Sequence, residues 1–271
     1  MRVCIYQADG TTCGVDRAER VLCMKQQCLA AAEARADLIV FPECYADGYP
    51  PDASAELVEK HLESAVSEAA TTAAQVRSLA VDHGVAILYG HIERIPSQHT
   101  SPDAPYLNSV TLVEGSSGEA LLKYSKLHTG TWHPEGRFAR GPHLPPIIEF
   151  HGIRLAAIVC YDAYFPELWR ALKRQGVQLV IVTWASTVPQ CVQSLTHTRA
   201  LENEIAVISV DWAAPYEGGS CYVEDTGNIH SVLQKKTVSL EVVQVDVHDM
   251  RGCGRTWDPV GDLAPQLKSM A

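Results

Sequence analysis

Three side chains that could together attack an electrophilic carbon stand at the ends of strand-like segments. Glu43 follows the apolar run 38–41, Cys160 ends the apolar run 153–160, and Lys126 ends a predicted hairpin. A cysteine attacks as its thiolate, and a nearby cation lowers the pKa of the thiol. A carboxylate within hydrogen-bond reach can take the thiol proton, and the same lysine can hold the negative oxygen that forms on the substrate.

Each of these residues also has a purely structural interpretation. Glu43 could be a surface acid at a strand end, Lys126 an exposed hairpin lysine and Cys160 a core cysteine. These interpretations are the common ones for a residue considered singly, because lysines are mostly exposed and free cysteines mostly buried. The functional hypothesis therefore rests on the three residues as a set.

The elements that must position this set alternate along almost the whole chain, which predicts an α/β fold. We predict one domain over residues 1–271, with sheets between helices and a tail from about 249 for which packing on a neighbouring subunit is one option. Helices are expected at about 16–36, 54–83 (ended by Gly84), 166–175 and 188–203. Strands are expected at 2–8, 38–41, 85–92, 106–114, 119–126, 153–160, 177–184, 205–212, 229–233 and 237–246.

Composition excludes several classes of protein. The 271 residues are 46% hydrophobic and 20% charged, which is typical of a soluble globular protein. The net charge of −10 and the lack of clustered Lys and Arg argue against a nucleic-acid partner. No apolar run is long enough to span a membrane, and the N-terminus is interpreted as a strand, not a signal peptide. We expect a cytoplasmic protein.

The nine cysteines and eleven histidines give no metal or disulfide pattern. There is no C-x-x-C pair, the cysteine count is odd, and no histidines have ligand spacing. We therefore predict reduced thiols, no metal and no cofactor. Cys44 is expected to pack, because its side chain should point away from that of Glu43 along an extended backbone. His128 and His133 are expected to be solvated loop residues.

Four blocks of sequence resemble the nitrilase-like carbon–nitrogen hydrolase superfamily, in that family's order over nearly the whole chain. The blocks are FPE with GY (41–43 and 48–49), YSKLH (124–128), CYDAYFPELWR (160–170) and TRALENEIAVISVD (198–211). The resemblance implies a four-layer α-β-β-α sandwich with two central mixed sheets. It also implies an enzyme that cleaves non-peptide C–N bonds.

The resemblance also assigns roles to individual residues. It implies that Glu43 is the general base, Lys126 the cation at the oxyanion and Cys160 the nucleophile. Glu135 is the candidate for a second glutamate, because EGRFARG resembles the family's E-x-x-F-x-x-G pattern; the alternative is a solvated loop acid. The backbone N–H of Tyr161 would be the second oxyanion donor.

The substrate is indicated more weakly. Nitrile-cleaving members of the family generally carry Cys-Trp-Glu, whereas this chain has Cys-Tyr-Asp at 160–162, which favours amide or N-carbamoyl hydrolysis with nitrile hydrolysis second. The expected pocket residues are Tyr49, the loop 128–140, Tyr161, Tyr164 and Trp184, although Trp184 could equally be core. An acyltransferase or a non-catalytic binding protein on the same fold remains a further alternative. Family members usually form homodimers or larger assemblies, so the resemblance predicts a homodimer or higher homo-oligomer, and helix 166–175 could serve as core or interface.

Overall fold

The computed structural model describes residues 1–11, 16–95 and 104–247, and it contains two mixed six-stranded sheets. The first sheet has the strand order β12-β1-β2-β3-β4-β5, and the second has the order β11-β10-β9-β8-β7-β6. Their strands are β1 (Arg2–Gln7), β2 (Leu38–Val40), β3 (Ala86–Arg94), β4 (Tyr106–Val113), β5 (Ala120–Ser125) and β12 (Ser239–Gln244), then β6 (Ile148–Phe150), β7 (Ile153–Val159), β8 (Leu179–Thr183), β9 (Ala206–Val210), β10 (Cys221–Val223) and β11 (Ile229–Val232).

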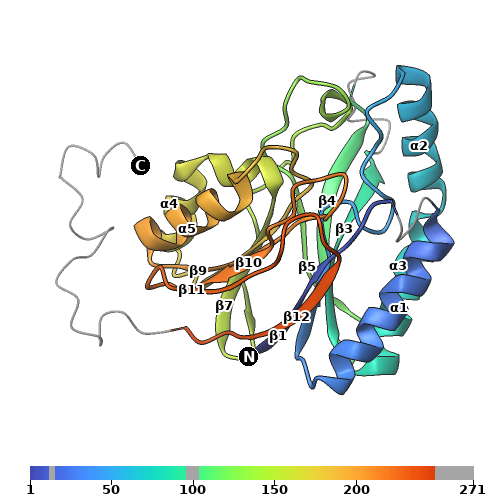
Figure 1. Cartoon of the computed structure of the whole chain (residues 1–271). Helices are drawn as coiled ribbons and strands as arrows, with labels where there is room; N and C mark the ends of the chain where they lie inside the picture. Colours follow the sequence, from blue (N-terminus) through green and yellow to red (C-terminus); the bar gives the residue numbers. More distant parts are fainter. Residues whose placement is uncertain (12–15, 96–103, 248–271) are drawn as a thin grey trace.

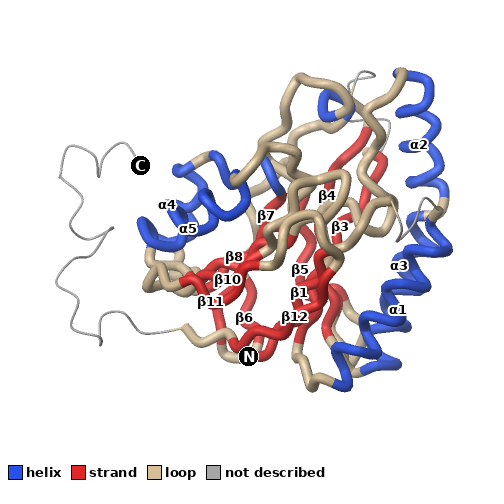
Figure 2. Tube along the Cα trace, viewed as in Figure 1, coloured by secondary structure: helices blue, strands red, loops and turns tan. Residues whose placement is uncertain are grey.

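Helices cover the outer face of each sheet, so the molecule has the four α-β-β-α layers that the sequence predicted (Figure 1). The first sheet is covered by α1 (Arg17–Glu33) and α3 (Ala69–His83), with α2 (Ala55–Ser67) beside them, and the second sheet by α4 (Pro166–Arg174) and α5 (Cys191–Asn203). Figure 2 shows the strands of both sheets gathered between the two groups of helices. None of the helices in the described residues is long and apolar enough to cross a membrane.

The sandwich follows from the two-residue period of its strands. In β1, Val3 and Ile5 belong to the core between the sheets, whereas Cys4 and Tyr6 pack in the cluster under α1 and α3. Successive side chains of a strand point to opposite faces, so a strand buried on both faces is apolar throughout. The second sheet shows the same property, because all five residues of β8 are buried and every residue of β7 except Arg154 is buried.

Several element boundaries match the sequence expectations, and others differ. Asp16 caps α1 by accepting a hydrogen bond from the Glu19 amide at 3.0 Å, and Gly84 ends α3 with a φ of 64°. The single helical stretch expected at 54–83 is two helices, which meet at Glu68. The short strands β6 and β10 were not predicted. The expected tail from 249 lies outside the described residues, as do Cys13 and Cys253.

The last two predicted strands belong to different sheets. β11 pairs antiparallel with β10 in the second sheet, whereas β12 pairs antiparallel with all six residues of β1 in the first. On α4, Leu168, Trp169 and Leu172 are buried in the chain's own core, so these three side chains are core and not an exposed interface.

Candidate active site

Glu43 lies three residues beyond the end of β2, with its side chain in the interior of the protein. The chain continues the parallel pairing for one residue, with the Phe41 amide donating to Leu88 O at 2.9 Å, and then turns. Trp212 Nε1 donates to the Glu43 carbonyl at 2.9 Å, and the Glu43 side chain is completely buried. The Glu43 backbone lies close to Gly90 on β3. A Cβ atom added at Gly90 would stand 2.8 Å from the Glu43 carbonyl carbon. A glycine on β3 is therefore needed where Glu43 enters the core.

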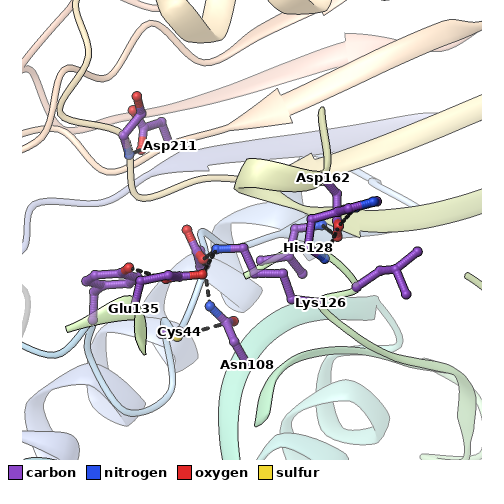
Figure 3. A network of polar contacts seen from close by, with 12 residues as sticks. Cys44, Asn108, Lys126, His128, Glu135, Asp162 and Asp211 are labelled. Carbon is purple, nitrogen blue, oxygen red and sulfur yellow. Dashed lines mark hydrogen bonds and ion pairs between the residues drawn. The ribbon is translucent and has the colours of Figure 1, made fainter. Parts of the chain in front are cut away.

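Lys126 occupies the centre of a buried group of charges. Its Nζ lies 3.0 Å from Glu43 Oε1 and 2.7 Å from Glu135 Oε1, and its side chain is 1% exposed (Figure 3). The lysine backbone is fixed on both sides, because its amide donates to Asn108 O at 2.8 Å and its carbonyl accepts from the Gly141 amide at 2.7 Å. One ammonium thus serves two carboxylates.

Glu135 is a buried member of this group and not a solvated loop acid. It begins a short 3-10 helix (Glu135–Arg137) and its side chain has no solvent exposure. Tyr49 OH donates to Glu135 Oε2 at 2.7 Å, so each carboxylate oxygen contacts a different partner. The sequence analysis named Glu135 and Tyr49 as separate candidates, and the structure shows that they are hydrogen-bonded to each other.

Asn108 is a site residue that the sequence analysis missed. It lies on β4 and is completely buried. Its Nδ2 donates to Glu43 Oε1 at 2.7 Å, and its Oδ1 accepts from Cys44 Sγ at 3.4 Å. Glu43 Oε2 is buried and has no hydrogen-bond partner within the described residues. Lys126 and Asn108 therefore orient the carboxylate through one oxygen and leave the other available.

Cys160 starts a 3-10 helix (Cys160–Tyr164) immediately after β7. Its φ is 43°, a left-handed conformation that costs a residue other than glycine about 1–3 kcal/mol and persists only where the surroundings impose it. The turn is held by Asp162, which accepts from Tyr124 OH at 2.8 Å and from the His128 amide at 2.9 Å. Figure 3 shows Asp162 and His128 side by side. Asp162 therefore ties the Cys160 turn to the segment that follows Lys126.

The electrostatics of the site are dominated by burial. Burial raises the pKa of Glu43; Lys126 opposes this rise and Glu135 adds to it. Burial lowers the pKa of Lys126, but Glu43 and Glu135 outweigh it and the net shift is well upward. Burial, then Glu43, raise the pKa of Cys160 well above its usual value, against the opposing effect of Lys126. A Glu43 that is easily protonated thus shares a site with a firmly charged lysine and a thiol.

The expected pocket residues lie in different environments. Tyr161 is half-buried beside Cys160, and Tyr164 is 40% exposed. Trp184 is 1% exposed, and its Nε1 donates to Ser209 Oγ at 3.1 Å. The Trp184 indole is therefore core, the second of the two interpretations that the sequence left open, because the end of β8 buries it against β9.

The remaining candidates from the sequence have structural contacts. Cys44 is fully buried beside Asn108, as expected of a packing residue. Of the two loop histidines, His133 is exposed as expected, with its Nε2 2.9 Å from Ala53 O, whereas His128 is half-buried, with its Nδ1 2.8 Å from Asp162 Oδ1. The seven cysteines of the described residues are all free, and these residues contain no cluster of three or more potential metal ligands.

Comparisons with known proteins identify the family of the chain. The model of the family described as carbon-nitrogen hydrolase matches residues 2–255. The Pseudomonas protegens protein named "Hydrolase in pqqF 5'region" is 31% identical over 221 residues, which cover 80% of this chain and 71% of that protein. An (R)-stereoselective amidase from Pseudomonas sp. is 27% identical over 243 residues, covering 86% of this chain and 82% of the relative.

Solved structures give the same result at the level of the fold. An amidase from Nesterenkonia sp. superposes with a TM-score of 0.78 at 25% identity, covering 100% of this chain and 95% of that one. The family match extends over nearly the entire sequence and includes every site residue described above. The chain therefore belongs to the carbon–nitrogen hydrolase family.

Proposed function

We propose that this protein is a cysteine-dependent amidase in which Cys160 is the nucleophile, Glu43 the general base and acid, and Lys126 the cation at the oxyanion. The observation that carries the proposal is the buried Lys126 ammonium, which contacts both Glu43 and Glu135 while Cys160 opens the neighbouring turn. A purely structural ion pair would not require a second buried carboxylate, because one is enough to neutralise one lysine.

The first half of the reaction forms a thioester. The Cys160 thiol gives its proton to Glu43, and the sulfur attacks the carbonyl carbon of the amide. The carbonyl oxygen becomes negative and is stabilised by Lys126 and by the backbone N–H of Tyr161, which lies in the first turn of a 3-10 helix, where N–H groups have no partner within the helix. Protonated Glu43 then passes its proton to the amide nitrogen, the C–N bond breaks, and ammonia leaves.

The second half releases the acid. Glu43 removes a proton from water, and the resulting hydroxide attacks the thioester carbon. The second tetrahedral intermediate expels the Cys160 sulfur, which recovers the proton from Glu43. Glu43 changes protonation state at every step, and the raised pKa that burial gives it suits a group that must be base and acid near neutral pH.

Glu135 has a positioning role in this proposal. It keeps the Lys126 ammonium charged and aimed between the two carboxylates, and Tyr49 fixes Glu135 in turn. Two hydrogen-bonded residues therefore hold the cation in place before substrate arrives, which is the arrangement that electrostatic stabilisation of an oxyanion needs.

The relatives favour an amide over a nitrile as substrate. The (R)-stereoselective amidase is named for amide cleavage, and a variant of the Nesterenkonia amidase with 25% identity has been solved in complex with butyramide. We propose a small amide or N-carbamoyl substrate for this chain, in a cytoplasmic enzyme that forms a homodimer. Gel filtration with light scattering tests the oligomeric state.

The function is tested by ammonia release from a panel of short amides, N-carbamoyl amines and nitriles. Release that is lost in Cys160→Ala and retained in Cys28→Ala, a buried cysteine on α1, supports the proposal. Turnover of nitriles alone contradicts the preference for amides. If hydroxylamine accelerates loss of the amide and water alone gives no acid, the enzyme is an acyltransferase. Intact-mass detection of an acyl group on Cys160 identifies the intermediate.

A further inference from the structure

We propose that Trp132, Tyr161 and Tyr164 form an aromatic wall beside Cys160 that selects uncharged primary amides with an aromatic acyl group. This proposal rests on the proposed amidase function and names the substrate class of the same site. The wall joins the two segments that carry the reacting groups: Trp132 lies between Lys126 and Glu135, and the two tyrosines follow Cys160.

The three rings contact one another in sequence. The Trp132 and Tyr161 rings meet edge to face, with centroids 5.1 Å apart and an interplanar angle of 88°. The Tyr161 and Tyr164 rings are 5.4 Å apart and tilted by 49°. These separations lie in the range of favourable aromatic pairs, so the rings form one continuous surface.

Two of the three rings of the wall are exposed. Trp132 is 50% exposed and Tyr164 is 40% exposed. Several large hydrophobic side chains of the described residues are strongly exposed, and Trp132 and Tyr164 are the two aromatic ones. The others are aliphatic and include Leu22, Leu57 and Leu144. Exposed apolar area that is contiguous with a reactive residue marks a binding surface more often than a scattered single side chain does.

Contacts with neighbouring side chains hold the two tyrosines of the wall in place. Tyr164 OH lies 2.8 Å from Cys191 Sγ, and the Tyr164 ring contacts the buried Trp184 ring at 6.5 Å. Phe165 meets Tyr161 edge to face at 5.1 Å and stacks on His128 at 3.7 Å. A surface fixed in this way loses little side-chain freedom when a ligand binds, so it discriminates between ligand shapes.

The two carboxylates around Lys126 disfavour anionic substrates. Lys126, the cation of the site, already contacts Glu43 and Glu135. A carboxylate on the acyl group would bring a third negative charge close to these two, without a second cation from the three residues of the wall. A flat uncharged ring can instead pack on Trp132 and Tyr164, and each aromatic contact contributes a factor of about 2 to 12 in affinity beyond area burial.

The test compares kcat/KM for ammonia release from phenylacetamide, cyclohexylacetamide, propionamide and 4-carboxyphenylacetamide. We expect the wild-type protein to prefer phenylacetamide over the cyclohexyl and carboxylated analogues. We expect Trp132→Ala to lower the ratio of phenylacetamide to propionamide by at least about fivefold, mainly through KM, and Trp132→Phe to restore much of it. Leu22→Ala, which removes an equally exposed side chain on α1, should leave the ratio unchanged.

Binding provides a readout that does not depend on turnover. In Cys160→Ala, calorimetry should show tighter binding of phenylacetamide than of cyclohexylacetamide, and adding Trp132→Ala should remove the difference. Equal effects of Trp132→Ala on phenylacetamide and propionamide, or no preference for the aromatic ring, overturn this proposal while hydrolysis of propionamide keeps the amidase function. Absence of ammonia release from every amide overturns both.

Discussion

Replacing Asn108 by leucine removes a hydrogen-bond donor of the Glu43 carboxylate, the one neutral donor to it in the part of the chain that the structure describes. Asn108 Nδ2 lies 2.7 Å from Glu43 Oε1, and both side chains are fully buried. Burial raises the pKa of Glu43 and the Asn108 hydrogen bond opposes the rise, so loss of the donor moves that pKa further up. Leucine has the same branching as asparagine and fills the site without a donor.

The size of the effect follows from the charge on the acceptor. A hydrogen bond to a charged group contributes about 1.5–3 kcal/mol, which corresponds to a factor of about 10 to 150. Glu43 must be ionised to take the thiol proton. On the acidic side of the pH profile, where Glu43 is mostly protonated, we therefore expect kcat/KM of Asn108→Leu to be about 10- to 150-fold lower than that of the wild-type protein. The acid limb of the profile should move to higher pH. At higher pH the two profiles should converge.

The assay is the pH dependence of kcat/KM for the best amide of the panel. Cys44→Ala is the matched control, because it breaks the other hydrogen bond of Asn108, at 3.4 Å, and keeps the donor to Glu43. We expect this control to keep the position of the acid limb. A uniform loss of activity in Asn108→Leu at all pH values, with the limb unmoved, would refute the reasoning, since it would mean that Asn108 acts through packing.

Three further predictions concern the scaffold. Gly90→Ala should destabilise the fold by about 1–3 kcal/mol and reduce activity, because the new Cβ would stand 2.3 Å from the Cys44 amide nitrogen; chemical denaturation and ammonia release measure both effects. Lys126→Met should cost about 3–5 kcal/mol at neutral pH, since it leaves two buried carboxylates without their cation, and less at low pH, where the carboxylates are protonated; denaturation at two pH values checks this. Burial lowers the pKa of His91 to about 4. Between pH 6.5 and pH 4 the imidazole is therefore protonated in the unfolded chain but not in the folded one. The free energy of unfolding should fall by about 3 kcal/mol as the pH decreases from 6.5 to 4. His91→Gln should show a shallower decline over this range, and an unchanged slope would contradict the assignment.

The sequence predicted those parts of the site that follow a recognisable local pattern. Glu43, Lys126 and Cys160 each end a strand-like run, and the structure gathers the first two within 3.0 Å of each other. Asn108 was missed because the strand segment 106–113 also contains Ser109 and Thr111, so a polar residue there looks like any half-buried strand position.

Long-range pairing limited the sequence predictions in the fold as well. The strands 229–233 and 237–246 follow one another in the chain, but β12 pairs with β1 from the opposite end of the sequence. The local sequence pattern predicts that a segment is a strand and which of its faces is buried. Its partner strand depends on contacts between residues more than 200 positions apart in the sequence, such as Arg2 opposite Gln244. The core position of Trp184 has the same origin, because the burial of a strand end depends on the neighbouring strand.

The order of these strands has a consequence for biosynthesis. Glu43, Lys126 and Glu135 leave the ribosome before Cys160, but β12 emerges after all of them. Until then β1 is an unpaired sheet edge, which is a template for association with other chains. The nascent polypeptide thus holds every proposed reacting group before the strand that completes the first sheet, and we expect hydrolytic competence to arise only when translation has passed residue 244.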